Sequence, residues 1–96
     1  TDGDADEEKE LIEMFVMYAE ESLDALRNCQ DGEDEEWKKA AHKLKGSAAN
    51  LGAQALSDVC VKAEQGFDQD KATKEQILAK ILGSYEQVRI LLQKKL

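Results

Sequence analysis

Apolar residues recur at steps of three and four along four segments of this 96-residue chain, and this spacing limits the fold more than any other feature. Such a spacing places apolar side chains on one face of an α-helix. Proline is absent, and the strong helix formers Ala, Leu, Glu, Lys and Gln dominate the composition. The sequence therefore predicts an all-α fold.

Turn signals divide the chain into helices. Asp31-Gly32, Gly52 and Gly66 are expected to end the first three helices. Thr73-Lys74-Glu75-Gln76 matches a capping box and predicts the start of the fourth. We expect helices over about 6–29, 34–51, 53–65 and 74–95, with residues 1–5 as a disordered acidic tail.

Short connections make successive helices run antiparallel, so the prediction is one domain over 1–96, an up-down-up-down four-helix bundle with long first and last helices. The expected inward residues are Leu11, Phe15, Ala19, Ser22, Leu23 and Leu26 on the first helix, widened by Ile12, Met14 and Val16; Trp37, Ala41, Leu44, Ala48 and Leu51 on the second; Leu56, Val59, Cys60 and Ala63 on the third; and Ile77, Leu78, Ile81, Leu82, Tyr85, Val88, Leu91 and Leu92 on the fourth. Cys29 and Cys60 fall on apolar positions and are expected to be small core residues rather than a disulfide or a metal site.

The net charge of -8 argues against nucleic acid and anionic membrane surfaces as partners. No apolar run approaches the roughly 18 residues that span a bilayer, and no signal-peptide pattern is present. A cytoplasmic location fits these features. The chain begins with Thr1 rather than Met, which favours a module of a larger protein.

His42 is the only histidine, and it lies off the apolar face of its predicted helix. At about 100° per residue, it falls about 140° from the centre of the apolar seam, on the solvent side. Its neighbours on that side are three lysines, an alanine and a glycine, namely Lys38, Lys39, Lys45, Ala49 and Gly46.

These neighbours suit a reactive imidazole. Lysines beside the ring disfavour a further positive charge on it and can stabilise a dianionic phosphoryl group. Gly46 and Ala49 leave clearance for another protein's active site. The spacing alone, however, leaves an ordinary solvated surface histidine equally open.

Other kinds of site fit poorly. Asp2, Asp4, Asp6 and Glu13 share the spacing of an EF-hand, but Glu7 occupies the position that needs glycine. One histidine cannot supply a zinc or di-iron site, and no glycine-rich phosphate loop supports a nucleotide site. We therefore expect no metal, no cofactor and no ATP site in this chain.

The segment His42–Ala48, followed by Leu51-Gly52-Ala53, resembles the signature of histidine-containing phosphotransfer (HPt) domains. His42, Lys45 three residues later, Gly46 four later, Ser47 five later and Gly52 ten later all agree with it. The resemblance covers essentially the whole chain.

This resemblance implies a four-helix bundle that carries a phosphoryl group on His42, taken from a receiver-domain aspartate and passed to another receiver's aspartate. Lys45 would hydrogen-bond or screen the phosphoryl oxygens, Gly46 would give access, and Lys43 would lie at the margin of the site. Mg²⁺ would belong to the receiver.

Partner docking is expected on the exposed residues around His42, among them Lys38, Lys39 and Ala49, in a modest transient interface formed by a monomer. The receivers could lie within the same hybrid sensor kinase.

One position departs from the resemblance. Some members have glutamine twenty-two residues after the histidine, where this chain has Glu64. A carboxylate there could accept from the inner ring N–H and fix the tautomer; a solvated helix residue is an equally open interpretation. Two alternative functions also remain: a docking bundle that is never phosphorylated, and the phosphotransfer domain of a chemotaxis-type kinase.

Overall fold

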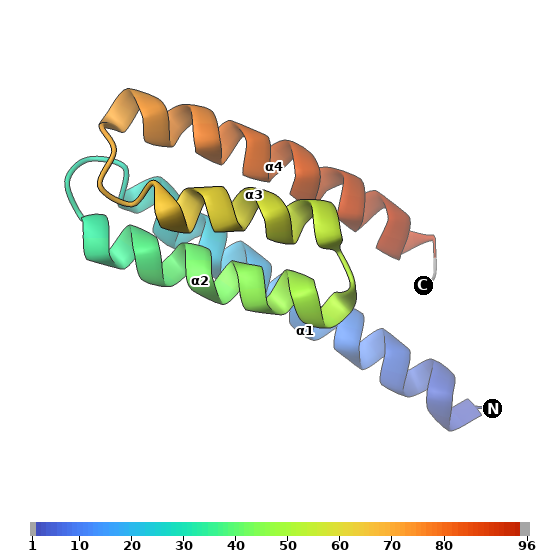
Figure 1. The fold of residues 1–96 in the computed structure, drawn as a ribbon. Coiled ribbons are helices and arrows are strands. Elements are labelled where there is room, and N and C mark those ends of the chain that lie inside the picture. The colour runs from blue at the N-terminus through green and yellow to red at the C-terminus, as the bar shows by residue number, and fades with distance from the viewer. Residues whose placement is uncertain (1, 95–96) are drawn as a thin grey trace.

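A computed structural model describes residues 2–94, with side chains described from residue 7 onward. The chain forms α1 (Asp2–Asn28), α2 (Asp34–Leu51), α3 (Gln54–Gln65) and α4 (Lys71–Gln93), and the described residues contain no strand. The predicted all-α class is confirmed. Each helix runs back along the one before it, and the first turns of α1 extend beyond the end of the bundle (Figure 1).

The start of α1 differs from the prediction. Residues 2–5 belong to the helix, whereas the sequence predicts a disordered tail there. Acidic residue types are favoured in the first turn of a helix by its dipole, and no proline interrupts the segment. Thr1 and the side chains of Asp2, Asp4 and Asp6 lie outside the described part.

The core is built from all four helices around Trp37, Leu26, Leu44, Leu56 and Ile81, which are fully buried. α2 packs most extensively against α3 and α1, and α1 has the least contact with α4. Cys29 and Cys60 are free and buried, as predicted.

Three residues that the sequence predicts to point inward are exposed. Leu11 and Leu91 are each 62% exposed, whereas their neighbours Ile12 and Leu92, also predicted inward, are buried. Ile12 shares the seven-residue spacing of Ala19 and Leu26, so it stays on the face that meets the bundle along the whole of α1.

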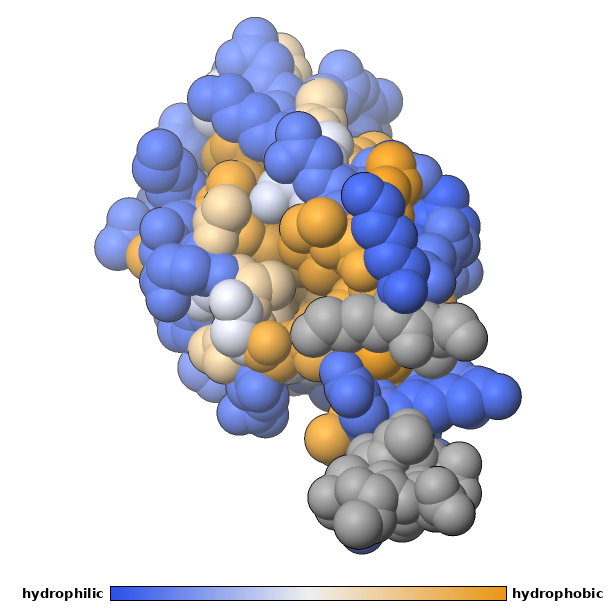
Figure 2. All heavy atoms as spheres, turned by 90° about the vertical axis from the view of Figure 1, so that its right-hand side faces the viewer, coloured by the Kyte–Doolittle hydropathy of each residue, from blue (hydrophilic) through white to orange (hydrophobic). Residues whose placement is uncertain are grey.

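Met14, predicted to widen the apolar face of α1, is also mainly exposed, at 46%. It lies in the part of α1 near the open end of the bundle. Figure 2 shows this end, where hydrophobic residues remain visible between the hydrophilic ones. Fewer helices surround α1 there, so a wide apolar face cannot be buried completely.

Turn geometry positions α3 beside α2. Gly52 has φ +83°, the left-handed conformation that favours glycine, and its N–H donates to carbonyl oxygens of the last turn of α2. α3 begins two residues later. This short reversal keeps α2 and α3 in lengthwise contact.

The start of α4 also differs from the prediction. Asp70, not Thr73, caps the helix, and its Oδ1 accepts from the Thr73 backbone N–H at 2.9 Å. Thr73 is thus the third residue of the helix and supplies one of the donors that a cap must satisfy.

Lys74, assigned by the sequence to a capping turn, is fully buried. Its Nζ forms an ion pair with Asp34 Oδ1 and lies 5.5 Å from the centre of the Trp37 ring. The contact joins the start of α4 to the start of α2.

Within the described residues, no helix is long and apolar enough to cross a membrane.

Candidate functional site

His42 projects from the middle of α2 on the side away from the core. Its side chain is 66% exposed, whereas the preceding Ala41 is completely buried. The helical spacing therefore placed the imidazole correctly: the same helix that packs the core presents this ring to solvent.

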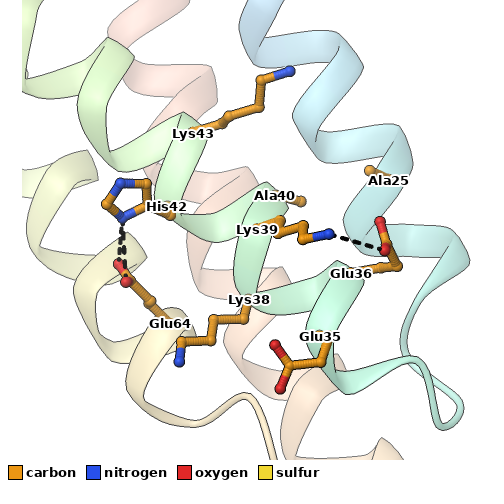
Figure 3. Close-up of a pocket in the computed structure, with 9 residues that line it drawn as sticks. All are labelled: Ala25, Glu35, Glu36, Lys38, Lys39, Ala40, His42, Lys43 and Glu64. Carbon is orange, nitrogen blue, oxygen red and sulfur yellow. Dashed lines mark hydrogen bonds and ion pairs between the residues drawn. The ribbon is translucent and has the colours of Figure 1, made fainter.

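Glu64 on α3 reaches the inner nitrogen of the ring (Figure 3). The His42 Nδ1 atom lies 3.2 Å from Glu64 Oε2 and 3.3 Å from Oε1. Glu64 Oε1 also forms an ion pair with Lys45 Nζ at 2.8 Å. One carboxylate thus contacts two basic residues of the predicted site, His42 and Lys45.

The environment keeps Glu64 ionised. The hydrogen bond from Lys45, and secondarily that from His42, lowers the pKa of the Glu64 carboxyl below its ordinary value. An ionised carboxylate can only accept hydrogen bonds, so the contact with His42 requires a proton on Nδ1. In the neutral ring, the outer nitrogen Nε2 then carries the free lone pair.

The position of Lys45 refines the expectation from sequence. Its side chain is 30% exposed, and its ammonium group pairs with Glu64. In the unphosphorylated protein, Lys45 therefore positions the Glu64 carboxylate, which in turn contacts the imidazole of His42. An approach to phosphoryl oxygens would require Lys45 to move from this pairing.

Gly46 leaves open space beside the ring. A Cβ atom built at this position meets nothing within 4 Å, and both Gly46 and Ala49 are exposed. Glycine here is not required by the backbone or by packing inside the domain.

A shallow concave surface lies beside His42, between α1, α2 and the end of α3 (Figure 3). Lys38, Lys39 and Lys43 line it, as the sequence suggested for the site or its margin, whereas Ala49 does not. Lys39 pairs with Glu36 at 3.6 Å, and Lys38 Nζ lies 4.7 Å from the centre of the Phe67 ring.

A second hollow involves residues that the sequence analysis did not assign to the site. It lies between α1 and α2 and is lined by Leu11, Phe15, Tyr18, Ser47, Asn50 and Leu51. Leu11 and Tyr18 are 62% and 43% exposed. Their seven-residue spacing was a detectable signal of a second apolar line on α1, separate from the core face.

Comparison with known proteins gives the family. The family model of the Hpt domain matches residues 10–93. The chain belongs to the Hpt domain family. No curated protein and no solved structure matched the sequence.

Membership gives the exposed histidine its chemical context. Hpt domains are phosphocarriers in phosphorelays and two-component signalling, and they interact with receiver domains. Phosphocarriers of this kind are not catalytic domains. In this Hpt domain, His42 is the single histidine available for such chemistry.

Proposed function

We propose that this Hpt domain accepts a phosphoryl group on Nε2 of His42 from the aspartyl phosphate of one receiver domain and passes it to the aspartate of another. The observation that carries the proposal is the pairing of an exposed imidazole with an ionised carboxylate at its inner nitrogen. That pairing directs the free lone pair of the neutral ring outward.

The transfer itself requires little of this chain beyond position. As the Nε2–phosphorus bond forms, the bond from phosphorus to the donor aspartate oxygen breaks, which returns that aspartate to a carboxylate. The ring gains positive charge, and the Glu64 carboxylate stabilises it through the Nδ1 proton. In the second transfer, the Nε2–phosphorus bond breaks as phosphorus bonds to an oxygen of the acceptor aspartate, and the ring loses its positive charge. Mg²⁺ would be held by the receivers.

Lys45 would assist after the first transfer. A phosphoryl group on Nε2 adds two negative charges near a lysine that already lies one helical turn from His42. The ammonium group would then leave Glu64, or share its hydrogen bonds, to screen the phosphoryl oxygens.

Docking would use the face formed by α1 and α2, which the antiparallel up-down-up-down bundle holds rigid. Four lysines, Lys38, Lys39, Lys43 and Lys45, lie on α2 in a chain of net charge -8. They would attract the acidic, metal-holding pocket of a receiver. The exposed apolar residues Leu11 and Tyr18 would supply apolar contact at the other end of the face.

The deciding experiment is label transfer from a phosphorylated receiver. We expect the wild-type domain to acquire phosphate that is labile in acid and stable in base, and the His42→Gln variant to acquire none. Lys45→Ala should slow transfer, whereas Lys80→Ala, which removes an exposed lysine of α4, should not.

The same experiment separates the alternatives. Receiver binding without label uptake by the wild type would make the domain a docking module. Labelling only by ATP and a kinase domain would assign it to a chemotaxis-type kinase. We further propose a cytoplasmic phosphorelay, with this monomeric domain as a module of a hybrid sensor kinase.

A further inference from the structure

Trp37 makes a buried polar contact with α3 next to the candidate site. Its indole Nε1–H donates to the backbone oxygen of Ala63 at 2.8 Å, and both residues are completely buried. Ala63 directly precedes Glu64, and Trp37 lies on α2, five residues before His42. The contact therefore joins the same two helices as the His42–Glu64 pair.

The oxygen that Trp37 contacts belongs to the last turn of a helix. α3 ends at Gln65, and carbonyl groups in a final turn lack intrahelical donors. The Lys62 oxygen accepts from the Gly66 N–H at 2.9 Å. The next oxygen, that of Ala63, accepts from the Trp37 indole. A side chain of α2 thus satisfies the end of α3.

The indole is also held on one of its faces. Lys74 Nζ, from the first turns of α4, lies 5.5 Å from the ring centre and pairs with Asp34. The aromatic face attracts this buried cation. The ring is therefore held by a carbonyl of α3 and a cation of α4, and following a displaced α3 would break its contact with Lys74.

We propose that Trp37 is a positioning residue for His42: its hydrogen bond to Ala63 fixes the end of α3 so that Glu64 stays in reach of Nδ1. This inference rests on the proposed phosphocarrier function. It adds a residue from the opposite, buried face of α2 to the site.

The distances make the contact sensitive to small movements. The Nδ1–carboxylate distances of 3.2 and 3.3 Å lie near the long end of the range for such hydrogen bonds. A displacement of α3 by roughly half an ångström would place the carboxylate beyond that range. The ring would then lose the partner that keeps its proton on Nδ1.

The test measures the tautomer of His42 in the unphosphorylated domain by ¹⁵N chemical shifts of the two ring nitrogens. Trp37→Phe keeps an aromatic ring and removes the N–H donor. We expect the proportion of the Nε2–H tautomer to rise severalfold, and the rate of phosphoryl uptake from a receiver to fall with it.

Tyr85→Phe is the matched control. It removes a donor from another buried ring, whose hydroxyl lies 3.4 Å from Glu20 Oε2, between α4 and α1. The tautomer ratio of this variant should equal that of the wild type. A wild-type ratio in Trp37→Phe would overturn the inference, as would an equal change in both variants.

The only tryptophan of the chain offers a second test if Trp37→Phe does not fold. An analogue with sulfur in place of the indole N–H keeps the shape and removes only the donor. An unchanged tautomer ratio in that protein would overturn the inference. Because the tautomer is read without phosphate, this failure would leave the proposed function intact, and absence of label uptake would leave the tautomer result standing.

Discussion

The role of Glu64 depends on how α3 packs against α2. Its contacts with Lys45 and His42 exist only because α3 packs beside α2, so the side chain contributes to stability as well as to the site. The lowered pKa of its carboxyl ties that contribution to pH.

We expect Glu64→Gln to lower the thermal unfolding midpoint near neutral pH. A carboxyl whose pKa is lower in the folded state stabilises the fold fully above its unfolded pKa, about 4.3, and loses this effect as pH falls through the folded value. The difference between wild type and variant should therefore be constant from about pH 6 to 7 and shrink below about pH 4.3.

Glu75→Gln, at an exposed position of α4, is the control for removal of one negative charge. A Glu64→Gln difference that persists unchanged after the pH has fallen through the folded pKa of Glu64 would contradict the prediction. Lys45→Ala should reproduce the pH dependence of Glu64→Gln, because both variants remove the same contact.

The two cysteines should differ in reactivity toward thiol reagents. Burial raises the pKa of the Cys60 thiol to about 12, and Cys60 has no exposed surface. Burial, with a hydrogen bond to Glu33, also raises the pKa of Cys29, which is 5% exposed beside the α1–α2 turn. We expect single-cysteine variants to label slowly at pH 8, with Cys60 the slower.

Labelling in urea supplies the reference rate for each cysteine. The Cys60 rate should rise with urea in parallel with global unfolding, because the thiol is reached only when the core opens. Rapid labelling of Cys60 in the native domain would show that α3 separates from the bundle by itself.

The exposure of single residues in the site could be predicted from the sequence, but contacts between helices could not. The exposure of His42 and Gly46 followed from helical angles alone, since both lie on one helix. The Lys45–Glu64 pair did not, because its distance depends on how α2 and α3 pack. The resemblance to HPt domains suggested Glu64 as a neighbour of His42, with a solvated helix residue equally open, and its contact with Lys45 was not predicted.

Along α2, Gly46 lowers helix stability and gives access to His42. A side chain at this position meets open space, so we expect Gly46→Ala to stabilise the domain by up to about 1 kcal/mol. Gly46→Gln should also fold, but it should slow phosphoryl transfer by blocking the receiver.

Gly83 of α4 is a matched control, because a Cβ there also meets nothing within 4 Å. Gly83→Gln should stabilise the helix without changing the transfer rate. Urea unfolding and receiver-to-domain transfer measure the two effects separately. Equal transfer rates for Gly46→Gln and the wild type would refute the access argument.

The start of α4 gives a test of the corrected cap. Asp70→Ala should lower the urea midpoint more than Thr73→Ala, because Asp70 supplies the oxygen and Thr73 only its backbone N–H. Its hydrogen bond with Thr73 lowers the pKa of Asp70, so the stabilisation is present above the ordinary carboxyl range and lost as pH falls. If Thr73→Ala lowered the urea midpoint more than Asp70→Ala does, Thr73 would be the cap, as the sequence predicts.

The end of a helix could be predicted where a single residue determines it. Gly52 has a positive φ, and α2 ends directly before it, as the sequence predicts. At α4, two residues that can act as caps lie three positions apart, Asp70 and Thr73, and propensity could not separate them. The folded geometry separates them, because Asp70 Oδ1 accepts from the Thr73 backbone N–H at 2.9 Å.

The bundle as a whole depends on a charged contact that its pattern of apolar residues does not show. Lys74 is completely buried, whereas the Asp34 side chain is 43% exposed. Removing Asp34 leaves a buried cation without its counterion. Removing Lys74 leaves a carboxylate that water can reach.

We therefore expect Asp34→Ala to cost about 3 kcal/mol or more, and Lys74→Met to cost clearly less, of the order of 1 kcal/mol. Urea unfolding of both variants and of the double variant measures the difference. In the double variant, part of the Asp34→Ala loss should be recovered. A larger loss for Lys74→Met would show that the ammonium group is held mainly by Trp37.

Sequence analysis could predict the helical class, the approximate number and bounds of the helices, and most of the core, since each follows from local periodicity. It could not predict Lys74 in the core, because lysines are almost never fully buried unless paired and the partner lies 40 residues away. Leu11 and Leu91 were misplaced for a similar reason: whether another helix covers a given position depends on the whole assembly.

The carboxylate beside the imidazole also affects how tightly a phosphoryl group would be kept. A dianion on Nε2 would share a small region with the negative charge of Glu64, and the single ammonium group of Lys45 cannot neutralise both. Their repulsion would oppose the attraction between Glu64 and the positively charged ring, and would thereby raise the group-transfer potential of the phosphohistidine. A domain built in this way would serve as a point of transit for phosphate, ready to release it to the next aspartate, rather than as a store.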